Sequence, residues 1–186
     1  VNADGAKSVA EARKLVDNMS SKIDHALGEI DSIRDAESEI GQLQERIKAL
    51  ERVAPLGIPL DLMAGFDGVE LFIAETSKSS KANAEFADIL SDIELQAAKG
   101  VIAVACRPSE SAAVQIGLSA LGAKPIQIPS GEGSADKMIA NAKSNIQTLE
   151  AKIDSANKAV SQWSIDNGRD LVILLEHLER EESIYT

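Results

Sequence analysis

Apolar residues recur every three or four positions along residues 6–53. This spacing places them on one face of an α-helix. The other positions are mostly charged residues, Ser and Gln, and no proline precedes Pro55. Gly28 and Gly41 lie just off this face, as bending points, points of close approach or tolerated glycines. The pattern predicts one long helix with an apolar stripe formed by Val9, Ala12, Val16, Met19, Ile23, Leu27, Ile30, Ile33, Ala36, Ile40, Leu43, Ile47, Leu50 and Val53.

Residues 134–186 form a second helical pattern. Ser134 is a suitable N-cap, Asp136 suits the first turn, and the apolar spacing continues from Ile139 to Trp163. A helix of this length cannot be covered by one globular core, so each long helix needs a partner. We therefore expect the two to fold back on each other as a long antiparallel hairpin, with Trp163 in its core.

The end of the second pattern is more apolar than its beginning. From Leu171 to Leu178 the apolar side chains cover more of the helix than one partner helix can bury. One interpretation is local overpacking against the start of the first helix. The other, which we favour, is that this face docks onto something outside the chain.

Between the long helices, short strand-like and helical segments alternate. Lys99-Gly100 is a turn signal between two strands, and prolines limit the last strand to a sheet edge. The order β-α-β-β-α-β predicts a ferredoxin-like lobe, a four-stranded sheet with both helices on one face. The segments are strand 69–74, helix 82–90, strand 93–97, a central strand 101–106, helix 108–121 closed by Gly122, and strand 125–129.

A junction, Val53–Glu75, connects the first long helix to this lobe. Pro55, Gly57 and Pro59 prevent the helix from continuing. The apolar residues among them are too many for a solvated linker, so we expect a packed junction; they are Leu56, Ile58, Leu60 and Leu62.

These segments predict an α+β protein, a long two-helix hairpin with an inserted βαββαβ lobe at its tip. The predicted domains are a first helix at residues 1–53, the lobe at 54–133 and a second helix at 134–186.

Composition excludes several classes of function. The net charge is −11, and nucleic-acid binding requires a basic patch, so nucleic acid is not expected as a partner. Aromatic residues make up only 3% of the chain, which argues against a ring-lined ligand pocket. Cys106, the one cysteine, cannot form an internal disulfide. The chain starts at Val1, and we expect it to be part of a longer protein.

Motifs that could support catalysis or ligand binding each have a simpler interpretation. Gly131–Ser134 follows a strand and precedes a helix, but it lacks the GxxxxGK[ST] pattern, so a capped turn is favoured over a phosphate loop. His25 and His177 lie far apart in the expected hairpin, which disfavours a shared metal site. Cys106 has no histidine nearby to activate it and is best explained as a small buried residue. Arg107 and Lys124 could meet an acidic partner helix.

The chain resembles a known family in its order of elements and in several phrases. A long helix ending in PLGIPLDLMAGFDGVELFIAE, a small α/β lobe, and the return LGAKPIQIPSGEGSADKMIANAKSNIQTLEAKI are similar to the soluble N-terminal part of subunit I of archaeal A-type ATP synthases. The equivalent in vacuolar-type proton pumps is subunit a. The resemblance covers most of the chain and rests on no single diagnostic motif.

The resemblance implies a stator protein: a cytoplasmic hairpin with a lobe at each end, followed by a membrane domain. This chain resembles the hairpin and its distal lobe. The implied partners are peripheral-stalk heterodimers (E with G or H) and the rest of the same polypeptide, whose proximal lobe would pack at Leu171–Leu178. The family's proton-conducting arginine lies in the membrane part and matches no residue here. We expect no enzyme activity, catalytic residues, cofactor, metal or small-molecule substrate.

Two other functions are compatible with the sequence. Ferredoxin-like lobes can bind small molecules, so the chain could be a sensor module on a coiled-coil arm. It could also be a coiled-coil spacer or chaperone arm that self-associates through Leu171–Leu178.

Overall fold

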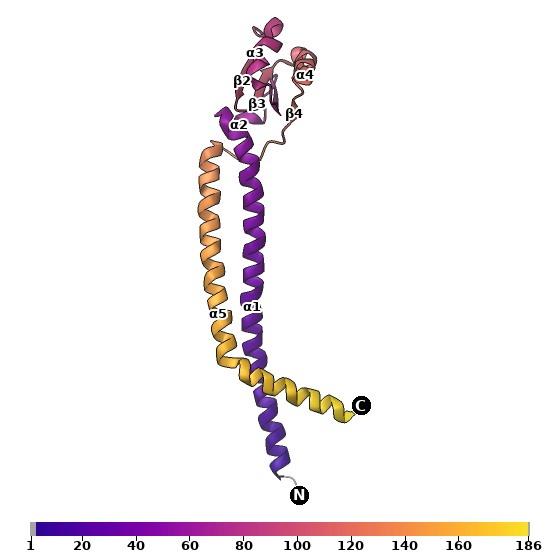
Figure 1. Cartoon of the computed structure of the whole chain (residues 1–186), viewed down its shortest axis with the longest axis vertical. Coiled ribbons are helices and arrows are strands. Elements are labelled where there is room, and N and C mark those ends of the chain that lie inside the picture. Colours follow the sequence, from indigo (N-terminus) through magenta and orange to yellow (C-terminus); the bar gives the residue numbers. More distant parts are fainter. Residues whose placement is uncertain (1–2, 186) are drawn as a thin grey trace. The chain divides into compact units, whose positions relative to one another are not determined.

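A computed structural model describes the backbone of residues 3–185 and the side chains of residues 14–176 and 179. Its contacts divide the chain into two compact units. One consists of Val1–Ile40 and Gln147–Thr186, and the other of Gly41–Ile146. Two long helices, α1 (Ala3–Val53) and α5 (Ala135–Tyr185), each contribute to both units (Figure 1). The sheet lies in the second unit, and the predicted α+β class is confirmed.

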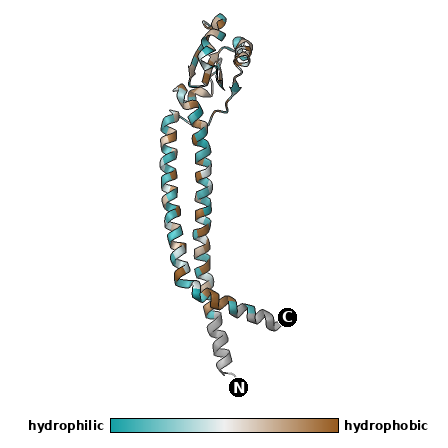
Figure 2. Ribbon diagram, viewed as in Figure 1, coloured by the Kyte–Doolittle hydropathy of each residue, from teal (hydrophilic) through white to brown (hydrophobic). Residues whose placement is uncertain are grey.

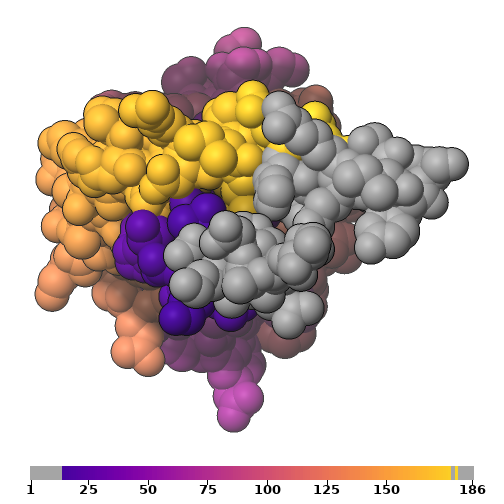
Figure 3. Space-filling model, turned by 90° about the horizontal axis from the view of Figure 1, so that it is seen from below, coloured from indigo at the N-terminus to yellow at the C-terminus, as the bar shows by residue number. Residues whose placement is uncertain are grey.

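The first unit is a pair of helical segments that lie side by side. The indigo segment of α1 and the yellow segment of α5 are adjacent in Figure 3 as well as in Figure 1. Their buried apolar residues are mostly small and include Met19, Ala26, Ala36 and Ala156. Larger members of the predicted stripe, such as Leu27 and Ile30, remain substantially exposed. A single partner helix covers only a narrow strip, so the predicted stripe is wider than the buried seam.

The second unit contains a four-stranded antiparallel sheet in the order β2-β3-β1-β4. Its strands are β1 (Glu70–Glu75), β2 (Ile93–Ala98), β3 (Val101–Cys106) and β4 (Lys124–Pro125). The predicted β2–β3 hairpin and the central position of β3 are confirmed. The turn residues of this hairpin, Lys99 and Gly100, both have positive φ, 42° and 88°. Positive φ at both central residues is what a two-residue type I′ hairpin turn requires.

Two short helical regions cover one face of the sheet. Phe86, after α3 (Ala82–Glu85), and Val114, in α4 (Ser111–Ala120), share an apolar cluster with Ile102 and Val104 of β3. Gly117 of α4 packs directly against the Phe86 ring. A Cβ at this position would come within 2.3 Å of Phe86 Cε1. The close approach explains why α4 has glycine at this position.

Two predicted elements differ from the structure. The helix expected at 82–90 is broken into α3 and η3 (Ala87–Ile89), and a separate short helix, η2 (Ser79–Lys81), precedes it. Asn83 and Asp88 are weak helix formers, and Phe86 between them has a non-helical backbone with its ring packed against α4.

The strand expected at 125–129 is reduced to β4, although Ile126 N–H still donates to Ile73 O at 3.0 Å. Proline supplies no amide donor, which limits pairing at both ends of that segment. The predicted edge position of this strand is confirmed.

Candidate functional site

The junction packs against the face of the sheet opposite α3 and α4. It contains η1 (Ala54–Leu56) and α2 (Leu60–Met63). Leu56, Leu60 and Met63 are 0%, 3% and 2% exposed. They belong to one apolar cluster with sheet and helix residues, among them Ile73, Val101, Ala103, Leu50 and Ile139. The predicted packed junction is therefore confirmed.

The prediction that Leu62 is part of this packed junction is wrong. Leu62 is 40% exposed, although Leu60 in the same helical turn is buried. Helix α2 is a single turn, so only one of its sides can face the core. The sequence shows two leucines two positions apart but does not reveal which one faces inward.

Polar contacts connect the junction to the start of α5. Leu60 N–H donates to Gly133 O at 2.9 Å, and Gly133 N–H donates to Asp61 Oδ1 at 2.9 Å. Arg46 Nη2 donates to Ser130 O at 2.8 Å. These bonds attach the loop before α5 both to α1 and to α2. They supplement the apolar cluster, so the helix ends and the sheet form one continuous core in the second unit.

Two ion pairs lie around the same core. Lys143 Nζ is 3.9 Å from Glu51 Oε1, and Arg52 Nε is 3.8 Å from Glu75 Oε1. All four side chains are substantially exposed, so each pair adds at most about 1 kcal/mol. The apolar packing dominates the stability of the junction.

The glycine-rich loop before α5 is a capped turn, as predicted. Gly133 has φ of 81°, and Lys137 N–H donates to Ser134 Oγ at 3.4 Å. Because Gly133 N–H already binds the Asp61 carboxylate, this amide is not available to a phosphate. A Cβ at Gly131 would lie 2.4 Å from Met138 Cε, but this atom is the end of a flexible side chain that can move aside.

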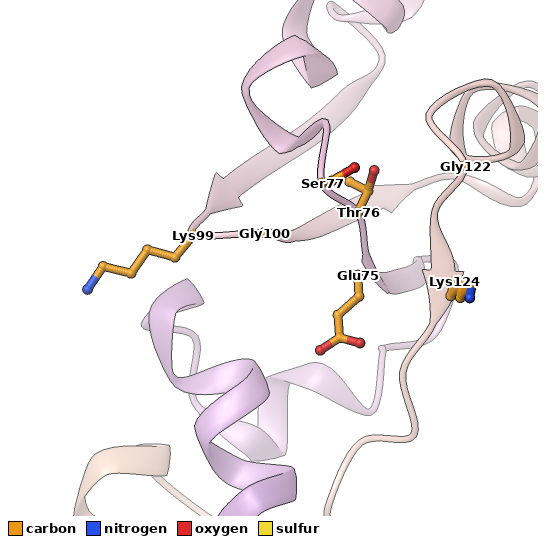
Figure 4. A pocket seen from close by; sticks show the side chains of 7 residues that line it. All are labelled: Glu75, Thr76, Ser77, Lys99, Gly100, Gly122 and Lys124. Atoms are coloured by element: carbon orange, nitrogen blue, oxygen red, sulfur yellow. The ribbon is translucent and has the colours of Figure 1, made fainter.

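A shallow hollow of about 470 Å³ lies at one end of the sheet (Figure 4). It is lined by Glu75, Thr76, Ser77, Lys99, Gly100, Gly122 and Lys124. In Figure 4 the Lys99 side chain extends away from Glu75 and Thr76.

Thr76 is buried at the edge of this hollow. Its Oγ1 donates to Leu121 O at 2.7 Å and accepts from Lys78 N–H at 3.1 Å. The hydroxyl therefore links the end of α4 to the turn that follows β1. The sequence does not predict the bond to Leu121, because the two residues are 45 positions apart.

Cys106 is buried at the end of β3. Burial raises the pKa of its thiol, and Glu70 and Glu110 add to the increase. A thiol with a raised pKa is a poor nucleophile at neutral pH. The interpretation of Cys106 as a small buried residue is confirmed.

Two histidines and two basic residues remain among the candidates from the sequence. His25 is exposed, and the side chain of His177 lies outside the described residues. Among the side chains that the structure describes, no group of three or more His, Cys, Asp or Glu residues could hold a metal ion. Arg107 and Lys124 are both exposed on the lobe.

Large apolar side chains are exposed in both units. In the second unit, Phe66 and Ile116 are the most exposed of them. In the first unit, the predicted apolar run on α5 has Leu174 buried and Val172, Ile173 and Leu175 exposed. Overpacking against α1 therefore does not account for the whole run, and Leu178 lies outside the described side chains.

In the described part of the chain, no helix is long and apolar enough to cross a membrane.

The sequence is similar to a curated protein, and no family model matches it. The similarity is to the A-type ATP synthase subunit I of Halobacterium salinarum, with 26% identity over 138 residues. The match covers 72% of this chain but only 19% of that protein, so the chain spans about a fifth of its relative.

A solved structure also resembles the chain. It is the cytoplasmic N-terminal domain of subunit I, a homolog of subunit a, of V-ATPase. The likeness covers 94% of this chain and 71% of that one, at 18% sequence identity and a TM-score of 0.40. A TM-score this low does not establish a common fold.

Proposed function

We propose that this chain is a non-enzymatic part of the stator of a rotary, ion-translocating ATPase. Its similarity to subunit I supports this proposal. The observation that carries it is the junction, where Leu56 and Leu60 join the sheet and the ends of both long helices in one apolar cluster. A stator must transmit force between its ends, and a shared core transmits force better than a flexible linker does.

In this proposal the two long helices act as one antiparallel hairpin. The residues between them act as a ferredoxin-like lobe at its tip, with functional boundaries at 1–53, 54–133 and 134–186. The strand order β2-β3-β1-β4 supports the lobe assignment.

The proposed partners are peripheral-stalk heterodimers (E with G or H). The chain would also contact the rest of its own polypeptide, the proximal lobe and the membrane domain, on the cytoplasmic side of the membrane. Exposed apolar side chains on the lobe, notably Phe66 and Ile116, offer contact area for a stalk helix. Neither nucleic acid nor a small-molecule substrate is required.

A pull-down with the E–G heterodimer tests this function. We expect the chain to retain the heterodimer. Phe66→Ser and Ile116→Ser, made separately, should each weaken retention. Both residues are exposed, so neither change should unfold the lobe. Failure of both this chain and the complete cytoplasmic domain of the parent protein to bind would contradict the proposal.

A second candidate function is a small-molecule sensor, favoured by the hollow of about 470 Å³ beside Thr76. We rank it lower because the Thr76 hydroxyl already has two partners. A thermal-shift screen against amino acids and nucleotides separates the two functions, since a specific ligand raises the melting temperature by mass action. A third candidate function is a coiled-coil arm that self-associates through Leu171–Leu178. Sedimentation of the chain would detect such self-association.

A further inference from the structure

Helix α5 bends within the first unit. Figure 1 shows the helix changing direction in its gold part, and Figure 2 shows the brown apolar run lying beyond that bend. The helix is nevertheless continuous from Ala135 to Tyr185. Proline is the commonest cause of a sharp bend, but this helix contains none. Its bend therefore requires another local cause.

Asn167, which lies in this part of α5, offers such a cause. It is a polar residue that is only 8% exposed, and its Nδ2 donates to Trp163 O at 3.0 Å. In a regular helix that carbonyl accepts the backbone N–H of the residue four positions later, which is Asn167 itself. A side chain that competes for the same acceptor loosens the turn and bends the helix.

Trp163 adds a second irregularity to the same turn. Its Nε1 is buried and is the one buried side-chain N or O atom without a hydrogen-bond partner among the described residues. A buried donor without a partner raises the free energy of the conformation that buries it. A different course of α5 that exposes this N–H to water would recover the missing hydrogen bond.

Gly168 makes such a change easier. It follows Asn167 directly, and glycine is less restricted in backbone conformation than any other residue. A Cβ at Gly168 would meet nothing within 4 Å, so close packing does not explain the absence of a side chain.

We propose that residues 163–168 form a joint in α5. The part of the helix beyond Gly168 pivots between the observed bent course and a straighter one, in which water reaches Trp163 Nε1. The irregularities at Trp163, Asn167 and Gly168 keep the two courses close in free energy. This inference does not depend on the proposed stator function.

The chain contains a single tryptophan, so the fluorescence of Trp163 reports directly on the joint. The test variant combines Asn167→Leu, which removes the competing amide, with Gly168→Ala, which favours a regular helix. We expect acrylamide to quench Trp163 at least about twofold more strongly in the wild-type chain than in this variant, because the variant populates the open course less. Equal quenching in the two proteins would overturn the proposal.

Spin labels measure the movement itself. Cysteines replace Glu150 and Glu176, which are exposed on either side of the joint, in a Cys106→Ala background. A straight helix would separate these positions by about 39 Å, at about 1.5 Å per residue. We expect a broad distribution of distances extending below that value, and a narrower one in the test variant.

Labels at Asp17 and Glu39 on α1 provide the control, since both positions are exposed and the helix between them lacks such a turn. A wild-type distribution across α5 as narrow as this control would show that the bend is rigid. That result would overturn the joint even if the fluorescence differed.

Discussion

Leu60→Asp places a carboxylate in the core that joins the lobe to the long helices. The leucine is 3% exposed and packs in one cluster with Leu56 and Ile73. Removing a buried leucine side chain costs about 2–5 kcal/mol. Burial of an unpaired carboxylate adds to this cost, so we expect a loss of at least about 4 kcal/mol in the second unit.

Leu62→Asp is the matched control. It introduces the same charge into the same helical turn, at a side chain that is 40% exposed. A surface substitution of this kind changes the free energy of unfolding by no more than about 0.5 kcal/mol.

Hydrogen exchange followed by mass spectrometry distinguishes the two variants. A loss of about 4 kcal/mol corresponds to a fall of about 1000-fold in amide protection, which should appear in β1 and β3. Far-UV circular dichroism should change much less, because the first unit consists of helix and lies outside this core.

Unchanged protection in Leu60→Asp would show that the junction is only a tether. Equal losses in both variants would show that the assignment of Leu60 as inward and Leu62 as outward is wrong.

Three further predictions concern the lobe and α1. Gly117→Ala should destabilise the second unit by about 1–3 kcal/mol in urea unfolding, because the added Cβ would clash with the Phe86 ring. Gly28→Ala should instead stabilise α1 by about 1 kcal/mol, because a Cβ at Gly28 would meet no atom within 4 Å and alanine favours the helix. Thr76→Val should cost about 1–2 kcal/mol by leaving Leu121 O without its donor, and Thr76→Ser, which keeps the hydroxyl, should cost less. Cys106 should resist a thiol reagent until the lobe is denatured. The pKa of Cys106 is raised in the folded state, so the neutral thiol contributes its full share to the free energy of unfolding below the unfolded pKa of about 8.5. This contribution should be lost as the pH rises above that value, and Cys106→Ala should not show this loss.

The elements set by periodicity and by turn chemistry could be predicted from the sequence. The three-to-four spacing identifies both long helices, and Lys99-Gly100 identifies the β2–β3 hairpin. Both signals are local, since each depends on residues that are neighbours in the chain. The broken helix around α3 and the shortened β4 could not be predicted, because packing and the prolines decide how far these weak elements extend.

The candidate site was predictable at the level of a segment but not of individual side chains. Pro55 and Pro59 show where the first long helix ends, and the apolar residues among them predict a packed junction. Which side of α2 faces inward depends on the position of the sheet, which the sequence does not show. Asn167 shows the same limit, since a polar residue on a mostly polar helix gives no sign that it is buried. Such details depend on contacts that are distant in sequence.

The most direct test of the stator assignment is a calorimetric titration of this chain with the E–G heterodimer. We predict saturable binding by the wild-type chain and by Leu62→Asp, and binding at least about tenfold weaker by Leu60→Asp, whose lobe is loosened. Absence of binding by the wild-type chain and by the complete cytoplasmic domain of its parent protein would contradict the account.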